Sequence, residues 1–302
     1  MTDTEETAAP CPHCLADSVS RFPDGHTWEF RGEKFTLARC DTCHGAFTRP
    51  TPSPELLQWL YSQAFSYRWY RHHYPAKFLD CIERLGEYRS RGNLRGRFIL
   101  DYGGGIGYMA RAARMFGLEC RTWDPYAGQT PHDVPKRKWD TIFCHHTLEH
   151  SPRPEQLLRE IRSFMREDSS LILAVPNAEG RGCQERGVDW VWCQPPLIHL
   201  HHFTRTGIES LLRRAGFVRL EVRYRDRWDA SILADVRAHR LFRFLDAAWH
   251  RFPLPVVTAQ MNSLARYIAL LGSRWLGSRG APEDRAELLV VAVPARDAGE
   301  TR

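Results

Sequence analysis

Residues Phe98–Gly107 read FILDYGGGIG and carry the strongest structural signal in the chain. An apolar run ends at Asp101, a glycine-rich turn follows, and Tyr108 opens a segment with a helical composition. Glycines suit such a turn because they accept positive φ angles and let a ligand approach the backbone closely. The start of a helix adds unpaired N–H donors and the positive end of a dipole. The stretch therefore predicts a strand, a tight turn and a helix that together hold a ligand.

The acid before the turn narrows the type of ligand. Glycine turns of this kind are also typical of dehydrogenases that bind a pyrophosphate, so the glycines alone are a weak indicator. Asp101 would repel a pyrophosphate but suits a ligand with an amino group, such as the amino-acid nucleoside S-adenosylmethionine. Asp124 closes the next expected strand, where a carboxylate can accept both hydroxyls of a ribose. The alternative for Asp124 is an acid in a surface turn.

From residue 97 onwards, apolar strand patterns alternate with helical patterns, which is typical of a mostly parallel α/β sheet. One helix is expected after Pro154, and another after a capping box formed by Thr206 and Glu209. An apolar stripe between Val257 and Trp275 predicts a core helix before the last strand, or alternatively a substrate lid or membrane-surface helix. The expected strands comprise residues 98–102, 118–123, 139–144, 171–175, 217–224 and 288–293.

Two Cys-x-x-Cys pairs stand near the amino terminus. Four thiolates at this spacing can close a tetrahedron around zinc, which leaves no open position for a substrate. A unit this small also needs such a link for stability. We therefore expect a structural zinc ion, the alternative being reactive or coincidental cysteine pairs. The expected ligands are Cys11, Cys14, Cys40 and Cys43.

Composition sets broad limits on the partners and on the location of the protein. The chain has 302 residues, of which 43% are hydrophobic and 26% charged, as in ordinary soluble proteins. A net charge of +6 permits an acidic partner or nucleic acid without favouring either. There is no secretory signal pattern and no apolar run of about 18 residues that would span a membrane. Together with nine cysteines, this predicts a cytoplasmic protein without a membrane span, whose oligomeric state is left open.

A histidine-rich segment, HHTLEH, follows the strand expected to begin at Trp139. Ligands of open α/β folds bind at this carboxyl edge of the sheet. A histidine there can serve as a general base because it titrates near neutral pH. We expect His145 and His146 to lie near the ligand, whereas His150 is expected only to hydrogen-bond the loop.

A second loop contains groups that suit a substrate with anionic or sugar-like character. Guanidinium groups bind anions through paired N–H donors, and flat aromatic rings can cover a sugar. The same residues could instead be interface aromatics. They are Arg181, Arg186, Trp190 and Trp192.

These motifs resemble the class I S-adenosylmethionine-dependent methyltransferases, within the group similar to the ubiquinone-biosynthesis methyltransferases. The amino-terminal part resembles the zinc-ribbon extension of some members. The resemblance spans residues 11 to about 224. The matching motifs are Asp101–Gly107, Asp124, Leu148–His150, Val175–Asn177, His202–Thr204 and Ala215–Phe217.

The resemblance implies a Rossmann-like sheet of seven strands, the last one antiparallel, with helices on both faces. It implies that Gly103, Gly105 and Gly107 shape the cofactor loop, that Asp124 binds ribose and that His145 lies against the cofactor. Only about fifteen residues separate Asp124 from Asp140, which is too few for the usual helix, strand and loops. We therefore expect a vestigial third strand, with Asp133 as a weak candidate for the acid on the adenine side.

The expected domain organisation follows from these patterns. A flexible tail at 1–9 precedes a zinc-ribbon unit at 10–50. A helical linker or cofactor lid at 51–96 then leads into a methyltransferase domain at 97–295. That domain contains the helical insertion at 225–286.

The expected reaction is in-line methyl transfer from S-adenosylmethionine to a small molecule, such as a sugar, a polyketide or another specialised metabolite. The protein then mainly orients the acceptor and excludes water. A base is needed only where the acceptor loses a proton, and the candidates are His146, His199 and His202. In zinc-containing sugar-modifying relatives, a histidine in the loop around His199 lies near the substrate.

Two other functions remain as alternatives. The first is an RNA methyltransferase whose zinc ribbon holds the substrate, although the modest charge and the absence of an RNA-binding motif count against it. The second is a non-catalytic scaffold that binds zinc and cofactor. The intact glycine turn and Asp124 count against this second alternative.

Overall fold

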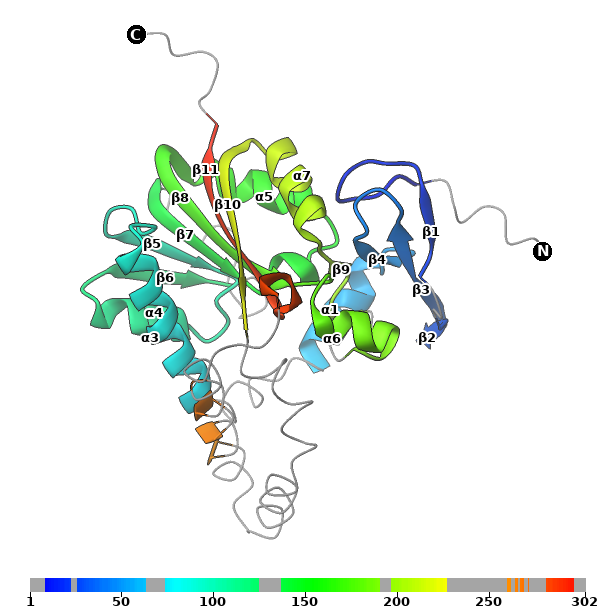
Figure 1. The fold of residues 1–302 in the computed structure, drawn as a ribbon, viewed down its shortest axis with the longest axis horizontal. Helices are drawn as coiled ribbons and strands as arrows, with labels where there is room; N and C mark the ends of the chain where they lie inside the picture. Colours follow the sequence, from blue (N-terminus) through cyan, green and yellow to red (C-terminus); the bar gives the residue numbers. More distant parts are fainter. Residues whose placement is uncertain are drawn as a thin grey trace, which may run out of the picture.

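The computed structural model describes residues 9–22, 26–63, 74–124, 137–190, 197–226, 260–261, 264–265, 267–268, 271 and 281–295. Two sheets lie side by side in Figure 1. The larger one forms the centre of an α/β domain, and the smaller one belongs to the amino-terminal unit.

The described residues of the α/β domain form a sheet of six strands in the order β10-β11-β8-β7-β5-β6. Neighbouring strands from β6 to β8 pair in parallel, whereas β11 runs antiparallel between β8 and β10. The expected antiparallel direction of the last strand is therefore confirmed. The strands are β5 (Phe98–Tyr102), β6 (Glu119–Trp123), β7 (Trp139–His145), β8 (Met165–Pro176), β10 (Phe217–Arg225) and β11 (Glu287–Pro294).

The expectation of seven strands is wrong for the part of the chain that the structure describes. There, β6 forms one edge of the sheet, with β5 as its neighbour. Residues 125–136, including the candidate Asp133, lie outside the described residues.

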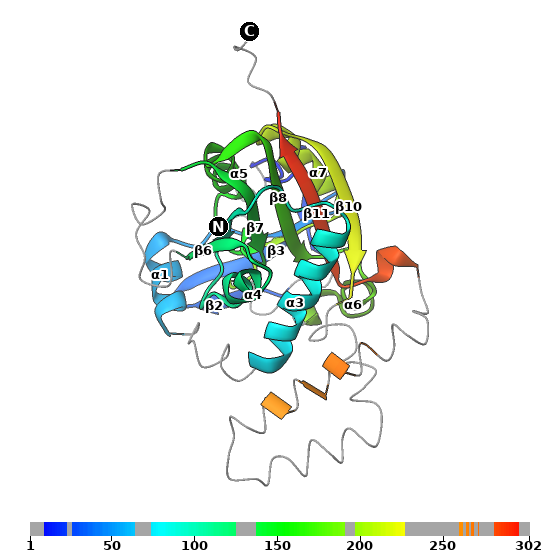
Figure 2. The ribbon, with the colours of Figure 1, turned by 90° about the vertical axis from the view of Figure 1, so that its left-hand side faces the viewer.

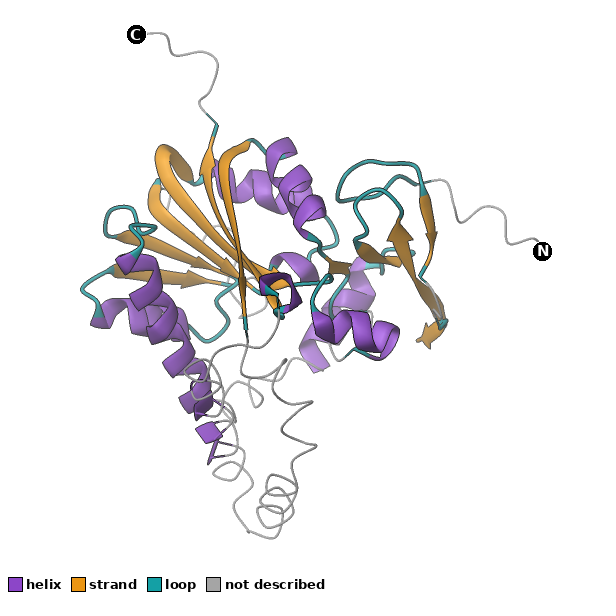
Figure 3. Cartoon of the chain, in the orientation of Figure 1, coloured by secondary structure: helices purple, strands orange, loops and turns teal. Residues whose placement is uncertain are grey.

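Helices cover both faces of the large sheet, as Figures 2 and 3 show. Side chains that alternate along the strands separate the core into two layers. Leu100, Ile142 and Leu173 pack on one side, while Ile99, Phe143 and Ile172 pack on the other. The first layer contacts α5 (Pro154–Ser163) and α7 (Arg205–Arg214), and the second contacts α3 (Tyr74–Ser90) and α4 (Tyr108–Met115).

The start of α7 differs from the sequence prediction. The capping residue is Thr204, whose Oγ1 accepts a hydrogen bond from the Gly207 N–H at 3.1 Å. The same hydroxyl donates to the Cys43 carbonyl at 2.6 Å. The expected capping box of Thr206 and Glu209 is therefore wrong, because a threonine two residues earlier binds both the helix and the amino-terminal unit.

The amino-terminal sheet includes a strand from the α/β domain. Its β4 pairs antiparallel with β9, so that Ala46 and Phe47 lie opposite His202 and His201. Arg214 of α7 also donates to the carbonyls of Pro12 and His13, at 3.0 and 2.6 Å. The amino-terminal unit is thus fixed to the α/β domain by backbone pairing. The strands are β1 (Val19–Arg21), β2 (Trp28–Phe30), β3 (Glu33–Cys40), β4 (Ala46–Arg49) and β9 (His201–His202).

Shorter elements complete the described fold. Within the segment expected to be helical at 51–96, the first helix begins at Pro54, and the Ser53 hydroxyl accepts from the Leu56 N–H at 3.2 Å. The expected insertion at 225–286 lies largely outside the described residues. Among the helices that are described, none is both long and apolar enough to cross a membrane. The remaining elements are α1 (Pro54–Gln63), η3 (Leu148–His150), α6 (Arg181–Arg186), η4 (Gly187–Asp189) and η5 (Pro282–Asp284).

A buried ion pair ties α3 to the start of β11. The Arg84 guanidinium donates to both carboxylate oxygens of Glu287, at 2.8 and 2.7 Å, and to Asp80 at 2.7 Å. The side chains of Arg84 and Glu287 are 3% and 0% exposed. Burial alone would raise the pKa of Glu287, but Arg84 and a hydrogen bond from His146 hold it well below its usual range. Glu287 is therefore an ionised group inside the protein.

The variant Arg84→Met should lose stability because it removes the guanidinium that binds both buried carboxylates, which leaves Asp80 only Arg225 and Glu287 only His146. Removing one partner of a buried pair costs about 3–5 kcal/mol in free energy of unfolding. Chemical denaturation followed by circular dichroism measures this. Arg91→Met is the matched control directly after the same helix, because the Arg91 side chain is 51% exposed in its 3.2 Å pair with Glu87. Equal losses in the two variants would contradict a stabilising role for the buried pair.

Candidate functional site

The turn between β5 and α4 requires glycine for two physical reasons. Gly103, Gly105 and Gly107 have φ angles of 71°, 57° and 78°, which side chains disfavour. A Cβ on Gly103 would also lie 2.2 Å from the Thr147 hydroxyl oxygen. The turn therefore keeps its backbone open at the helix start, as a bound ligand needs.

Asp101 lies at the end of β5, beneath this turn. It is 2% exposed, and its Oδ2 is 3.4 Å from the Thr122 hydroxyl of the neighbouring strand. Burial raises the pKa of Asp101 to about 7, with a smaller contribution from the negative charge of Asp124. A buried carboxyl of this kind is poised to become ionised when a cationic group binds beside it.

Asp124 directly follows β6 and contacts the turn from the other side. Its Oδ2 accepts a hydrogen bond from the Gly105 N–H at 2.7 Å. The two acids thus lie at the ends of adjacent parallel strands, with the glycine turn between them. The structure brings together the five turn and acid positions that the sequence singled out for a cofactor: Asp101, Gly103, Gly105, Gly107 and Asp124.

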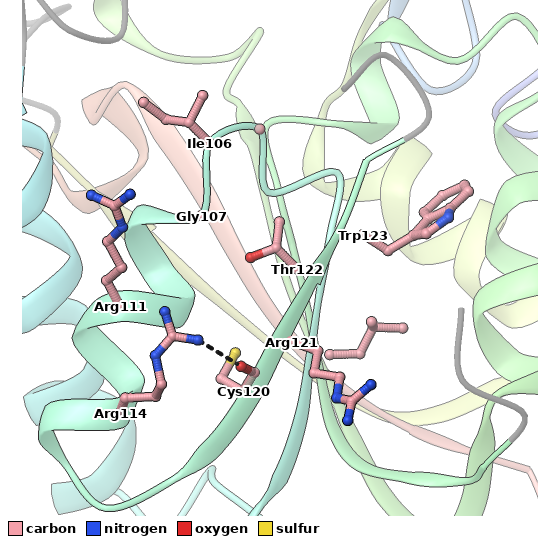
Figure 4. Close-up of a pocket in the computed structure, with 10 residues that line it drawn as sticks. Ile106, Gly107, Arg111, Arg114, Cys120, Arg121, Thr122 and Trp123 are labelled. Atoms are coloured by element: carbon pink, nitrogen blue, oxygen red, sulfur yellow. Dashed lines mark hydrogen bonds between the residues drawn. The ribbon is translucent and has the colours of Figure 1, made fainter. Parts of the chain in front are cut away.

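A cavity of about 460 Å³ borders the turn and β6 (Figure 4). Gly105, Ile106, Gly107, Thr122 and Trp123 contribute to its lining. Three guanidinium groups give the rest of the wall a positive charge, and one of them donates to the Cys120 carbonyl at 3.4 Å. They belong to Arg111, Arg114 and Arg121. The glycine turn is thus accessible from the side of β6.

His145 ends β7 at the carboxyl edge of the sheet. Its Nε2 lies 3.2 Å from the Tyr88 hydroxyl of α3, and its ring stacks on Phe143 at a centroid distance of 5.4 Å. Burial and the nearby Arg84 charge hold the pKa of His145 well below its usual range. The imidazole is therefore neutral and fixed between α3 and the sheet.

His146 has both ring nitrogens bound to carboxylates. Nδ1 lies 3.1 Å from Glu149 Oε1, and Nε2 lies 2.8 Å from Glu287 Oε2. Where both carboxylates are ionised, each ring nitrogen donates to one of them. This arrangement extends the Arg84–Glu287 pair to the loop after β7. Proton uptake from a substrate by His146 would require these bonds to break.

The loop after β7 also contacts the glycine turn and the segment before β9. The Thr147 hydroxyl donates to the Gly103 carbonyl at 3.3 Å. The Leu200 N–H donates to the Glu149 carbonyl at 2.8 Å, and the rings of His150 and His199 lie 4.8 Å apart. His199 is therefore placed beside the loop that touches the cofactor turn.

His202 lies away from this group, within the β4–β9 pairing. It is 1% exposed, and burial lowers its pKa to about 4. Its neighbour His201 bridges the two units, since its Nε2 donates to the Ser151 carbonyl at 3.0 Å and its Nδ1 lies 3.1 Å from His13 Nε2. Of the three candidate bases, His146 and His199 are thus at the carboxyl edge, and His202 is at the contact between units.

The four cysteines of the amino-terminal unit converge. Their sulfur atoms all lie within 4.8 Å of one another, with 3.7 Å between Cys11 and Cys43 and 3.5 Å between Cys14 and Cys40. A zinc–sulfur bond of about 2.3 Å implies tetrahedral edges of about 3.8 Å. The donor set and its spacing therefore fit a tetrahedral zinc ion.

The expected substrate loop contains a structural residue. Trp190 is 2% exposed and packs with Leu37 of β3, Cys183 and Val188. Arg181 pairs with Glu185 at 2.6 Å on the exposed side of α6. Trp190 therefore matches the interface alternative, and Trp192 lies outside the described residues.

Sequence reasoning missed four residues of this region. Arg84 and Tyr88 sit one turn apart in α3, and Glu287 begins an otherwise apolar strand. The available signal for Glu287 was an acid directly before an apolar run. Asp101 gave the corresponding signal at the end of an apolar run. Thr147 offered no comparable pattern.

Comparisons with known proteins agree with this site. A family model for a methyltransferase domain matches residues 70–222, just over half of the chain. The chain therefore belongs to this methyltransferase-domain family. It is an S-adenosylmethionine-dependent methyltransferase, with a Rossmann-like sheet and helices on both faces. No curated protein sequence matches it.

Several solved methyltransferases are similar to this chain. Phosphoethanolamine N-methyltransferase 2 from Haemonchus contortus is 14% identical, with a TM-score of 0.46 over 90% of this chain and 72% of that one. Magnesium protoporphyrin IX methyltransferase from Synechocystis PCC 6803 is 13% identical, with a TM-score of 0.45 over 80% and 100%. An S-adenosylmethionine-dependent methyltransferase from Thermotoga maritima is 13% identical, with a TM-score of 0.41 over 80% and 99%.

Asp101 should make the stability of the ligand-free protein depend on pH. Because its native pKa of about 7 lies above the ordinary value of 3.8, the unfolded chain releases this proton first as the pH rises. The free energy of unfolding therefore falls between about pH 4 and pH 7, by up to about 1.4 kcal/mol per pH unit from this group. Asp101→Asn should remove that part of the fall, as denaturation at several pH values would reveal.

Asp168→Asn serves as the control for this measurement, because the Asp168 side chain is 90% exposed. It should keep the pH dependence of the original protein. If Asp101→Asn also kept it, Asp101 would not hold its proton in the native state.

Proposed function

We propose that this methyltransferase acts on a small-molecule acceptor, such as a sugar, a polyketide or another specialised metabolite. The proposed cofactor site rests on the glycine turn, which is held between the buried Asp101 and Asp124 at the ends of adjacent strands. The acceptor side is supported by histidines at the same edge of the sheet, which can handle a hydroxyl proton.

The residues around the turn fit S-adenosylmethionine. The bound cofactor supplies a methyl group that is activated by its positively charged sulfur. Gly103, Gly105 and Gly107 would leave room for it, and Asp124 would accept hydrogen bonds from its ribose hydroxyls. Asp101 would face its cationic amino-acid part. His145 would contribute an apolar, neutral wall beside it, since its ring is stacked on Phe143.

Among the three proposed catalytic histidines, we assign the acceptor-side chemistry to His199. His202 is enclosed at the contact with the amino-terminal unit, and His146 already donates to two carboxylates. His199 is only half-buried and lies next to the loop that contacts the glycine turn. Its partial exposure would let it meet an acceptor beside that loop.

We further propose that Cys11, Cys14, Cys40 and Cys43 hold a structural zinc ion. Four protein ligands leave no position for a substrate, so the ion would stabilise the amino-terminal unit and not act on the acceptor. This extension, and membership of the group similar to ubiquinone-biosynthesis methyltransferases, belong to the same proposal. The free thiols among the described cysteines support a cytoplasmic location.

The division of the chain is also proposed. The zinc-binding unit at 10–50 and the methyltransferase domain at 97–295 would be joined by the helical segment at 51–96. That segment would act partly as a lid, because α3 brings Tyr88 and Arg84 to the carboxyl edge of the sheet.

The test of the function uses cofactor with an isotopically labelled methyl group. Incubation with metabolite pools, followed by mass spectrometry, should reveal label in a small molecule. The variant Asp124→Ala should bind S-adenosylmethionine at least about tenfold more weakly in calorimetry, because two charge-assisted hydrogen bonds are lost. Asp168→Ala should bind it normally.

Two results would overturn the proposal. Label found in RNA and in no metabolite would replace the small-molecule acceptor with the RNA alternative. Cofactor binding without transfer of label to any acceptor would favour the scaffold alternative. Unchanged affinity in Asp124→Ala would refute the ribose assignment alone.

The zinc proposal predicts about one zinc ion per chain in the purified protein, measured by elemental analysis. Cys40→Ser should lose the metal and lower the melting temperature, because a thiolate ligand is replaced by a weaker hydroxyl. Cys81→Ser is the control, since Cys81 is buried in α3, away from the four ligands. Full zinc content in Cys40→Ser would refute the site.

A further inference from the structure

The carboxylate of Glu149 is fully buried, and only one of its two oxygens has a hydrogen-bond partner among the described residues. Its side chain is 0% exposed, and Oε1 accepts from His146 at 3.1 Å. Within the described part of the chain, no group donates a hydrogen bond to the other oxygen, Oε2. A buried carboxylate oxygen without a donor calls for a partner such as a cation.

Two imidazoles lie close to the Glu149 carboxylate. One ligand atom from each of Glu149, His150 and His199 lies within 4.8 Å of the others. The Nδ1 atom of His150 is 2.6 Å from the Ile198 carbonyl and must therefore carry its hydrogen. The lone pair of His150 is then on Nε2. A histidine with one nitrogen bound to a backbone carbonyl is the usual state of a metal ligand.

We propose that Glu149, His150 and His199 bind a divalent transition-metal ion of the Mn²⁺, Fe²⁺ or Zn²⁺ type. Two imidazoles and one carboxylate suit these ions, whereas Mg²⁺ and Ca²⁺ prefer all-oxygen sites. Three protein ligands leave open positions, unlike the four cysteines. Nothing in the cysteine site overlaps with this one, since the two share no residue.

The surroundings of the cluster are those of an oriented metal site. Glu149 Oε1 is held by His146, which is held in turn by Glu287 and Arg84. Such outer partners fix the direction in which a ligand carboxylate points. The backbone of Glu149 is fixed too, because its carbonyl accepts from the Leu200 N–H at 2.8 Å. The segment carrying His199 is thereby attached to the loop carrying Glu149.

The role of the ion rests on the proposed function. Thr147, in the same loop, contacts the glycine turn, so the cluster and the cofactor turn are linked by one short loop. A bound hydroxyl would lose its proton to solvent more readily. Its oxygen would then form a bond to the methyl carbon as the carbon–sulfur bond breaks, leaving a neutral thioether. His199 would thus act on the acceptor through the bound ion.

The test is a titration of the full-length protein with MnCl₂, after brief dialysis against a chelator. The electron paramagnetic resonance signal of free Mn²⁺ reports binding, because bound ions lose the sharp signal. The unmodified protein should bind about one Mn²⁺ per chain. His199→Ala and Glu149→Gln should each weaken this binding roughly tenfold or more.

Two controls keep the result interpretable. His44→Ala replaces an exposed histidine of the amino-terminal unit and should leave Mn²⁺ binding unchanged. Zinc content and melting temperature of every variant are measured in parallel, so that loss of folding is recognised. His199→Ala carries the decision if Glu149→Gln does not fold, because His199 is only half-buried.

Equal Mn²⁺ binding by His199→Ala and the unmodified protein would overturn the site, and so would no binding by the unmodified protein. Cofactor binding and methyl transfer are measured separately. Their persistence without Mn²⁺ binding would refute the metal site but leave the proposed function intact. Mn²⁺ binding without methyl transfer would support the metal site but refute its role in the reaction.

Discussion

The carboxyl edge of the large sheet depends on one chain of buried charges. Arg84 binds Glu287, Glu287 binds His146, and His146 binds Glu149. Each member is costly to bury alone, and each is stable only because the next one is ionised. The chain joins the helix α3, the antiparallel strand β11 and the loop after β7. The position of the candidate ligands therefore follows from an ion pair whose partners are about two hundred residues apart in sequence.

The backbone conformation of His146 is determined by the same buried charges. Its φ angle of 51° is unfavourable for a residue with a side chain, and such conformations persist only where the surroundings determine them. Two carboxylates hold the ring from opposite sides, which fixes both the side chain and the turn behind it. The turn then directs Thr147 towards Gly103 and Glu149 into the protein. A strained residue thus separates the cofactor side of the loop from the acceptor side.

The sequence was informative wherever a local pattern determines the structure. Apolar runs predicted the strands, and the direction of the last strand followed from the resemblance. The acid and glycine spacing located Asp101 and Asp124, because strand ends and tight turns are short-range features. The cap at Thr204 was missed because its hydroxyl is also positioned by a hydrogen bond to the Cys43 carbonyl, more than a hundred residues away. Arg84 and Glu287 were missed for the same reason, since nothing near either residue encodes the other.

The amino-terminal unit and the histidine cluster meet through one short segment. Leu200 binds the loop carrying Glu149, His201 contacts His13 beside the cysteines, and Thr204 binds Cys43. Burial lowers the pKa values of His13 and His201, so this contact is a hydrogen bond between neutral rings and tolerates little displacement. A zinc ion bound by the four cysteines would therefore fix the position of β9. Since His199 lies two residues before His201, the rigidity of the zinc-binding unit would set the position of an acceptor-side ligand without touching the acceptor.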